Sequence, residues 1–185
     1  MSNVRWFKAA VLAAGALWCA GCSNNKVPVK DTVEEASTAP KLLSAVNMGD
    51  PKAEKQLLSG FYAIEANAWR WTGKDFSVAL KPPMGSAAQG AILDFELSAP
   101  QAAIDKLHSV TLSATVNGNA LAPETFSQEG AASYKRELAA NLLGGDLVRI
   151  DFHLDKAMPP ANGDMRQLGV VARSVALEAK STGGK

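Results

Sequence analysis

Apolar and polar side chains alternate residue by residue in several stretches of this chain. Because successive side chains of a β-strand point to opposite faces of a sheet, this period predicts strands with one buried face and one wet face. The expected buried residues are Phe76, Val78 and Leu80; Leu93, Phe95 and Leu97; Val110, Leu112, Ala114 and Val116; and Val148, Ile150, Phe152 and Leu154. Antiparallel sheets packed on one side show this pattern, so the sequence predicts an all-β, antiparallel β-sandwich.

A short helix is predicted before the strands, at about residues 50–59. Asp50 has the side chain of an N-cap, and Pro51 suits the first helical position. Gly60 then provides a stop signal. Strand-like alternation follows from Tyr62 onward.

Two local signals predict further connections. Ser98 and Gln101 have the spacing of a capping box, which predicts a second short helix, and Asn-Gly-Asn at 117–119 is typical of a hairpin turn. The last strand is predicted at 168–179, but neither of its two alternating sets of side chains makes a clean buried face, because one face would hold an arginine among aliphatic residues. That face would contain Val171, Arg173, Val175 and Leu177. The sequence therefore leaves the register of this last strand open.

The amino terminus has the pattern of a secretory leader. Arg5 and Lys8 precede a short apolar run, and small residues precede Cys22 in "CAGC". This ending resembles the lipobox of bacterial lipoproteins, although Cys19 stands where an aliphatic residue is usual. The resemblance implies lipidation of Cys22, and the alternative is an ordinary secretory signal with cleavage nearby.

Lipidation also explains where the cysteines lie in the chain. Both cysteines lie in the leader, so the remaining chain has none to form a disulfide. Several acyl chains on one cysteine hold a protein firmly on a bilayer. Ser23 follows Cys22, where Asp would resemble an inner-membrane retention signal. The predicted location is therefore the outer membrane, facing the periplasm or the cell surface.

The predicted organisation has four parts: a signal peptide at 1–21, a flexible tether at 22–48, the β-sandwich with its short helix at 49–181, and a tail at 182–185. The tether is predicted because residues 23–40 are rich in charge, Pro, Ser and Thr. Removal of the leader takes away Arg5 and Lys8 and changes the formal charge from +1 to about −1. This balance argues against a nucleic-acid partner, which would need a basic stripe.

No catalytic or metal-binding pattern stands out. His108 and His153 are the only histidines and have no ligand partners at helical spacing, so neither a metal nor another cofactor is predicted. Asp94 and Glu96 share a strand face at a separation that would suit glycoside hydrolysis, but charges that alternate on a wet strand face give the same pair. His153 is expected to be an ordinary surface residue. The chain is predicted not to be an enzyme.

The segment "GFYAIEANAWRWTG" contains the candidate ligand-binding residues. Trp69 and Trp71 point to one face of a strand and Arg70 to the other. As a platform, the rings would stack on sugars while Glu65, Arg70 or Arg166 supplies hydrogen bonds. As core residues, the rings would anchor the two sheets to each other. The core interpretation is favoured because neighbouring aromatic and aliphatic residues also need burial.

Arg166 is also open to two interpretations. It lies two residues after Asp164, so the two side chains can form an ion pair that fixes a loop, and this is favoured over contact with a ligand.

Three segments together resemble a known family: "GFYAIEANAWRWTG", "VTLSATVNGNAL" and "MPPANGDMRQLGVVARSVAL". Their order is similar to that of a bacterial envelope domain with a galactose-binding-like, jelly-roll β-sandwich, over roughly residues 58–178. The resemblance implies the fold but no uniform activity. We therefore predict a non-catalytic, lipid-anchored envelope protein that binds carbohydrate or cell-surface polysaccharide. The alternative is an accessory lipoprotein that binds another envelope protein through its β-sandwich.

Overall fold

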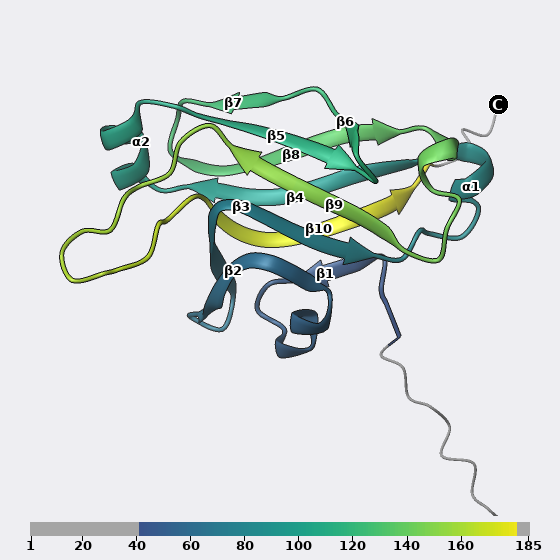
Figure 1. Cartoon of the computed structure of the whole chain (residues 1–185), viewed down its shortest axis with the longest axis horizontal. Coiled ribbons are helices and arrows are strands. Elements are labelled where there is room, and N and C mark those ends of the chain that lie inside the picture. Colours follow the sequence, from purple (N-terminus) through teal and green to yellow (C-terminus); the bar gives the residue numbers. More distant parts are fainter. Residues whose placement is uncertain (1–40, 181–185) are drawn as a thin grey trace, which may run out of the picture. The chain divides into compact units, whose positions relative to one another are not determined.

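The computed structural model describes residues 41–180, in which strands dominate (Figure 1). The strands are β1 (Ala45–Asn47), β2 (Leu57–Glu65), β3 (Trp69–Leu80), β4 (Ala91–Ala99), β5 (Val110–Val116), β6 (Asn119–Ala120), β7 (Glu124–Phe126), β8 (Gly130–Leu138), β9 (Val148–Leu154) and β10 (Val171–Ala179). The helices are the 3-10 helices η1 (Pro51–Lys55) and η2 (Ala140–Leu142) and the α-helices α1 (Ser86–Gln89) and α2 (Gln101–Leu107). The predicted signal peptide, Cys22 and most of the predicted tether lie outside the described residues.

The strands form one curled sheet in the order β6-β5-β9-β3-β10-β4-β8, with β1, β2 and β7 attached to its sides. All of its named strand pairs are antiparallel. Strand β3 pairs with β10 at Arg70–Trp71 and with β9 at Asp75–Leu80. The sheet therefore folds over at β3, with β10, β4 and β8 in one layer and β9 and β5 in the other (Figure 1). The prediction of an antiparallel β-sandwich is confirmed.

Three phenylalanines join the layers at the centre of the core. Phe76 of β3 stacks on Phe152 of β9 with 4.9 Å between ring centroids. Phe95 of β4 lies 5.0 Å from Phe152, although β4 and β9 are not neighbours in the sheet. These contacts can form only if the two layers face each other. The alternating residues that were predicted to be buried are all buried.

A bulge settles the register of the last strand. Ala172 of β10 pairs with Leu97, but Ser174 pairs with Glu96, so β10 has one extra residue at Arg173. Val171, Val175 and Leu177 are buried while Arg173 is exposed. A bulge changes the face to which a strand presents its side chains. Arg173 therefore leaves the face that it would otherwise share with aliphatic residues.

The helix predicted at 50–59 is wrong in its length. Asp50 does cap the segment, since its side chain accepts a hydrogen bond from the Lys52 amide, and Pro51 begins η1. However, η1 ends at Lys55 and β2 begins at Leu57. Gly60 is not a helix stop but lies inside β2 with φ of 74°.

Two other predictions need correction. Helix α2 is present, but Pro100 precedes it and no side chain caps it; the Ser98 hydroxyl instead donates to the Gly130 carbonyl. The predicted tether also extends too far, because residues 45–47 form β1 on β10 and Val46 and Met48 are buried. In both places a tertiary contact outweighs the local pattern. The hairpin at 117–119 is confirmed between β5 and β6, which pair there.

Gly60 gives a direct test of how closely β2 and β3 pack. A Cβ at Gly60 would lie 2.0 Å from the Asp75 carbonyl oxygen, whereas a Cβ at Gly85 would meet nothing within 4 Å. The two glycines have similar φ values of 74° and 83°. Alanine therefore adds comparable backbone strain at both positions but a steric clash only at Gly60.

We expect Gly60→Ala to lower the free energy of unfolding by about 1 to 3 kcal/mol more than Gly85→Ala does. Chemical denaturation of both variants would measure the difference. Equal losses would contradict the close approach of β2 to β3.

Candidate functional site

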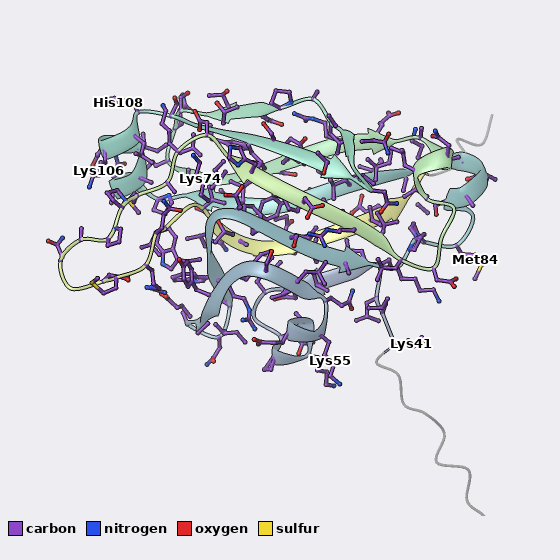
Figure 2. All side chains as sticks on the ribbon, in the orientation of Figure 1. Lys41, Lys55, Lys74, Met84, Lys106 and His108 are labelled. Atoms are coloured by element: carbon purple, nitrogen blue, oxygen red, sulfur yellow. The ribbon has the colours of Figure 1, made fainter. Side chains whose placement is uncertain are left out.

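Strand β3 has two segments that face different surroundings. Its first residues pair with β10 and its last with β9, and Lys74, labelled in Figure 2, lies between them. Trp69 and Trp71 belong to the first segment and Asp75 and Ser77 to the second. Each segment contributes to one candidate site.

The first candidate site brings four of the predicted ligand residues together. The Trp69 and Trp71 rings meet edge to face with 6.0 Å between centroids. Glu65 lies directly opposite Trp69 in the β2–β3 ladder, and its carboxylate accepts a hydrogen bond of 2.8 Å from Arg166. We call Glu65, Trp69, Trp71 and Arg166 the tryptophan–arginine patch.

The expectation that the two tryptophans are core residues is only partly met. Both side chains are half-buried, neither enclosed like Phe76 nor fully exposed. Their edge-to-face contact is a favourable aromatic geometry and leaves part of each residue accessible. The rings therefore both pack on the domain and offer apolar surface to a partner.

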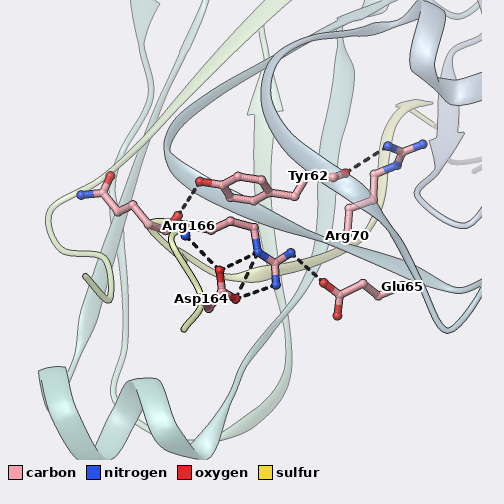
Figure 3. A network of polar contacts seen from close by, with 6 residues as sticks. Tyr62, Glu65, Arg70, Asp164 and Arg166 are labelled. Carbon is pink, nitrogen blue, oxygen red and sulfur yellow. Dashed lines mark hydrogen bonds and ion pairs between the residues drawn. The ribbon is translucent and has the colours of Figure 1, made fainter. Parts of the chain in front are cut away.

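Asp164 holds Arg166 in position (Figure 3). The Arg166 guanidinium donates to both Asp164 carboxylate oxygens, and its backbone amide donates to one of them at 2.9 Å. These hydrogen bonds hold the pKa of Asp164 below its usual value, and bonds to Asp164 and Glu65 raise the pKa of Arg166. The predicted loop-fixing ion pair is confirmed.

Tyr62 fastens the same loop to β2. Its hydroxyl donates to the Gln167 carbonyl at 3.0 Å, and the Arg166 guanidinium carbon lies 5.3 Å from the centre of the Tyr62 ring. The loop before β10 is thus tied to β2 by Tyr62 and by Glu65 (Figure 3). Arg166 is preorganised before any partner arrives.

Arg70, the fifth predicted ligand residue, is buried with 3% of its side chain exposed. Its guanidinium donates to the carbonyls of Met48 and Tyr62 and to the carboxylate of Glu54, each at 3.1 Å. Arg70 does point away from the tryptophans, but that side of β3 is the interior and not the solvent. Arg70 therefore has a structural role, because its donors satisfy backbone groups inside the domain.

The second candidate site is a polar hollow of about 310 Å³ on the outside of the layer formed by β2, β3, β9 and β5. In the register, His153 lies between Asp75 and Ser113, and Asp151 lies between Ser77 and Thr115. The polar side chains that line it are Ser59, Asp75, Ser77, Ser113, Thr115, Arg149, Asp151 and His153. We call this site the polar hollow.

Short contacts organise the polar hollow. His153 Nδ1 lies 2.6 Å from Asp75 Oδ1, and Arg149 contacts Asp151 at 2.7 Å. The alternation that buries Val148, Ile150, Phe152 and Leu154 leaves Arg149, Asp151 and His153 outside the core. The alternation alone did not show that these residues form a site. Asp75 and Ser113 come to lie beside His153 only because their strands pair in this register. Sequence spacing had no signal for these pairs.

The carboxylates of Asp94 and Glu96 contact side chains of different neighbouring strands. Asp94 is only 8% exposed, contrary to the expected wet position, because Lys135 contacts it at 2.7 Å and the Ser133 hydroxyl also bonds it. Glu96 instead accepts a hydrogen bond from Ser174. Both carboxylates are thus engaged by neighbouring strands.

Within residues 41–180, no group of three or more His, Cys, Asp or Glu residues is arranged to hold a metal ion. In the same part of the chain, no helix has the length and apolar character needed to cross a membrane.

Comparison with known proteins gives only distant structural similarity. No protein-family model and no curated protein sequence matches the chain. The chain is similar to the CBM36-1 domain of a multidomain xylanase from the hindgut metagenome of Trinervitermes trinervoides, at 11% identity over 75% of this chain and 98% of that one, with a TM-score of 0.43. TM-scores below 0.5 assign no function, so the resemblance to envelope jelly-roll domains stays a prediction.

A second similar structure is CBM51-2 in complex with GlcNAc and INT domains from Clostridium perfringens ZmpB. The identity is 14% over 74% of this chain and 28% of that one, with a TM-score of 0.37. A third is a Paenibacillus cycloisomaltooligosaccharide glucanotransferase complexed with cycloisomaltoheptaose, at 11% identity over 75% of this chain and 18% of that one, with a TM-score of 0.40. The chain spans less than a third of either protein's length.

The burial of Arg70 can be tested against an exposed arginine. Arg70→Met removes the donors that satisfy the Met48 and Tyr62 carbonyls, and each buried group left unpaired costs about 1 to 3 kcal/mol. We expect a loss of about 2 to 4 kcal/mol in the free energy of unfolding. Arg173→Met, on the exposed bulge, should change it by less than about 0.5 kcal/mol. Urea denaturation measures both, and a neutral Arg70→Met would contradict a structural role.

Proposed function

We propose that this protein is a non-catalytic, lipid-anchored component of the bacterial envelope that binds carbohydrate through the tryptophan–arginine patch. One observation supports this more than any other. Four residues that were singled out for sugar-binding chemistry come together from β2, β3 and the loop before β10. Arg70 takes no part, because it is buried.

The patch combines the two kinds of contact that a sugar needs. The apolar face of a sugar ring can pack on the half-buried tryptophans, whose aromatic surface is large. Arg166 and Glu65 retain 33% and 35% side-chain exposure, so they can still hydrogen-bond to hydroxyl groups. Because Asp164 already holds Arg166, a ligand need not order that side chain.

A second candidate function is binding to another envelope protein through β8. This strand ends the main path of the sheet, and within residues 41–180 it pairs only with β4. An unpaired strand edge can accept a strand from a partner through backbone hydrogen bonds. A partner that binds here would leave the tryptophan–arginine patch unused.

The carbohydrate proposal is tested with a glycan array and the full-length protein in detergent. Trp71→Ala should weaken binding about tenfold or more, because the stacking surface is lost. Trp71→Phe should retain most of the binding and guards against simple unfolding of the alanine variant. Arg173→Gln, outside the patch, is the matched surface control. Binding that is unchanged in Trp71→Ala, or no bound glycan at all, would overturn the proposal.

The anchor is tested separately, since Cys22 lies outside the described residues. Cys22→Ser should abolish acylation, because the acyl chains need the cysteine sulfur, and the protein should leave the detergent phase in Triton X-114 partitioning. Cys19→Ser leaves the lipidated position intact and should still partition into detergent. A Cys22→Ser protein that remains in the detergent phase would contradict lipid anchoring at this residue.

A further inference from the structure

Asparagine precedes glycine at two positions of the chain, Asn117–Gly118 and Asn162–Gly163. Asparagine is chemically labile before glycine, because glycine has no side chain to hinder attack by its backbone nitrogen on the asparagine amide carbon. Both pairs lie in tight turns, with φ values of 48° and 82° at the first pair and 53° and 83° at the second. The dipeptide and its φ angles therefore do not distinguish the two asparagines.

The side chain of Asn117 is held at both of its polar atoms. Its Nδ2 donates to the Leu142 carbonyl at 3.0 Å, and its Oδ1 accepts a hydrogen bond of 3.0 Å from the Arg149 amide. The Asn117 backbone amide also donates to the Arg149 carbonyl at 2.9 Å. The amide carbon of Asn117 can reach the Gly118 nitrogen only after such contacts break, and each hydrogen bond that must break first slows the reaction.

The side chain of Asn162 is not held in this way. Asn162 is exposed, and within the described part of the chain its side chain makes no hydrogen bond. A Cβ at Gly163 would meet nothing within 4 Å, so the space around this glycine is open. The Asn162 amide can therefore turn toward the Gly163 nitrogen without breaking a side-chain contact.

The two turns also differ in what supports them. Asn117–Gly118 joins β5 and β6, which pair directly on either side of the turn. Asn162–Gly163 instead lies in the loop between β9 and β10, which extends beyond the strands (Figure 1). The backbone bridges that close this loop are Ala161–Asp164 and Met158–Leu168. A turn supported by two isolated bridges opens locally more often than a turn inside a sheet.

We propose that Asn162 is a site of spontaneous covalent modification, at which the asparagine reacts with water and becomes aspartate or isoaspartate. The Gly163 nitrogen forms a bond to Asn162 Cγ, the Cγ–Nδ2 bond breaks, and the proton of the Gly163 amide leaves with the side-chain nitrogen as ammonia. Water then opens the cyclic imide at one of its two carbonyls. Opening at one carbonyl gives aspartate and opening at the other gives isoaspartate, so no oxidant or reductant is needed.

Isoaspartate changes the loop more than aspartate does. It adds a methylene to the main chain between Ala161 and Asp164, so the two hydrogen bonds of 3.0 Å that join these residues no longer fit the turn. The new carboxylate also lies two residues from Asp164, whose carboxylate holds Arg166. The loop should therefore open more often. An effect on carbohydrate binding rests on the proposed function, whereas the modification and the loosening of the loop do not.

The test uses the full-length protein in detergent, incubated at physiological temperature and mildly alkaline pH, with peptide mapping by mass spectrometry at intervals. Asn162 should convert at least about tenfold faster than Asn117, which is the internal control. In concentrated urea the folded contacts are lost, so the two rates should become similar. Equal rates in the folded protein, or a tenfold difference that persists in urea, would overturn the proposal.

Hydrogen exchange measures the loosening of the loop. The Leu168 amide donates to the Met158 carbonyl at 3.0 Å, and it should exchange at least about tenfold faster in the isoaspartate form, separated by ion-exchange chromatography. Asn162→Gly keeps a residue that accepts a positive φ but has no amide to convert, so its Leu168 exchange should not change with incubation. Unchanged exchange in the isoaspartate form, or equal acceleration in incubated Asn162→Gly, would contradict the loosening.

Discussion

The fold depends on β3, because this one strand belongs to both layers of the sandwich. Its first residues hydrogen-bond with β10 and its last with β9. Close backbone contacts at glycines accompany this change of partner: a Cβ at Gly60 or at Gly169 would meet carbonyl oxygens of β3 at 2.0 and 2.5 Å. Phe76 extends from the same strand into the core and contacts Phe95 and Phe152 of the two layers.

The change of partner along β3 also separates two surfaces of different chemistry. The first segment presents half-buried tryptophans beside a fixed arginine, which suits stacking on an apolar face. The second is lined by hydroxyl and charged side chains together with the edges of core residues such as Phe76 and Phe152. Both surfaces rest on paired strands, so their side chains are held in place by the sheet.

Arg70 shows how a buried charge can serve the structure next to a candidate site. Its guanidinium joins the segment after β1, strand β2 and helix η1 to β3. Glu54, its ion-pair partner, is 74% exposed, so only the arginine is taken out of water. The carbonyls of Met48 and Tyr62 compensate for that desolvation. This arrangement holds the β2–β3 hairpin, and with it Glu65 and Trp69, in place.

The sequence alone determined the fold class, the buried faces of the central strands, the hairpin at 117–119 and the Asp164–Arg166 pair, because each follows from a short-range period or spacing. It also singled out Glu65, Trp69, Trp71 and Arg166 as candidates. The tertiary structure decided that Glu65 and Arg166, 101 residues apart, are bonded, that Arg70 is buried, and that Arg173 leaves its face at a bulge. It also brought Asp75 to His153 and Ser113. These outcomes depend on strand register and on contacts between distant segments, and a one-dimensional pattern contains neither.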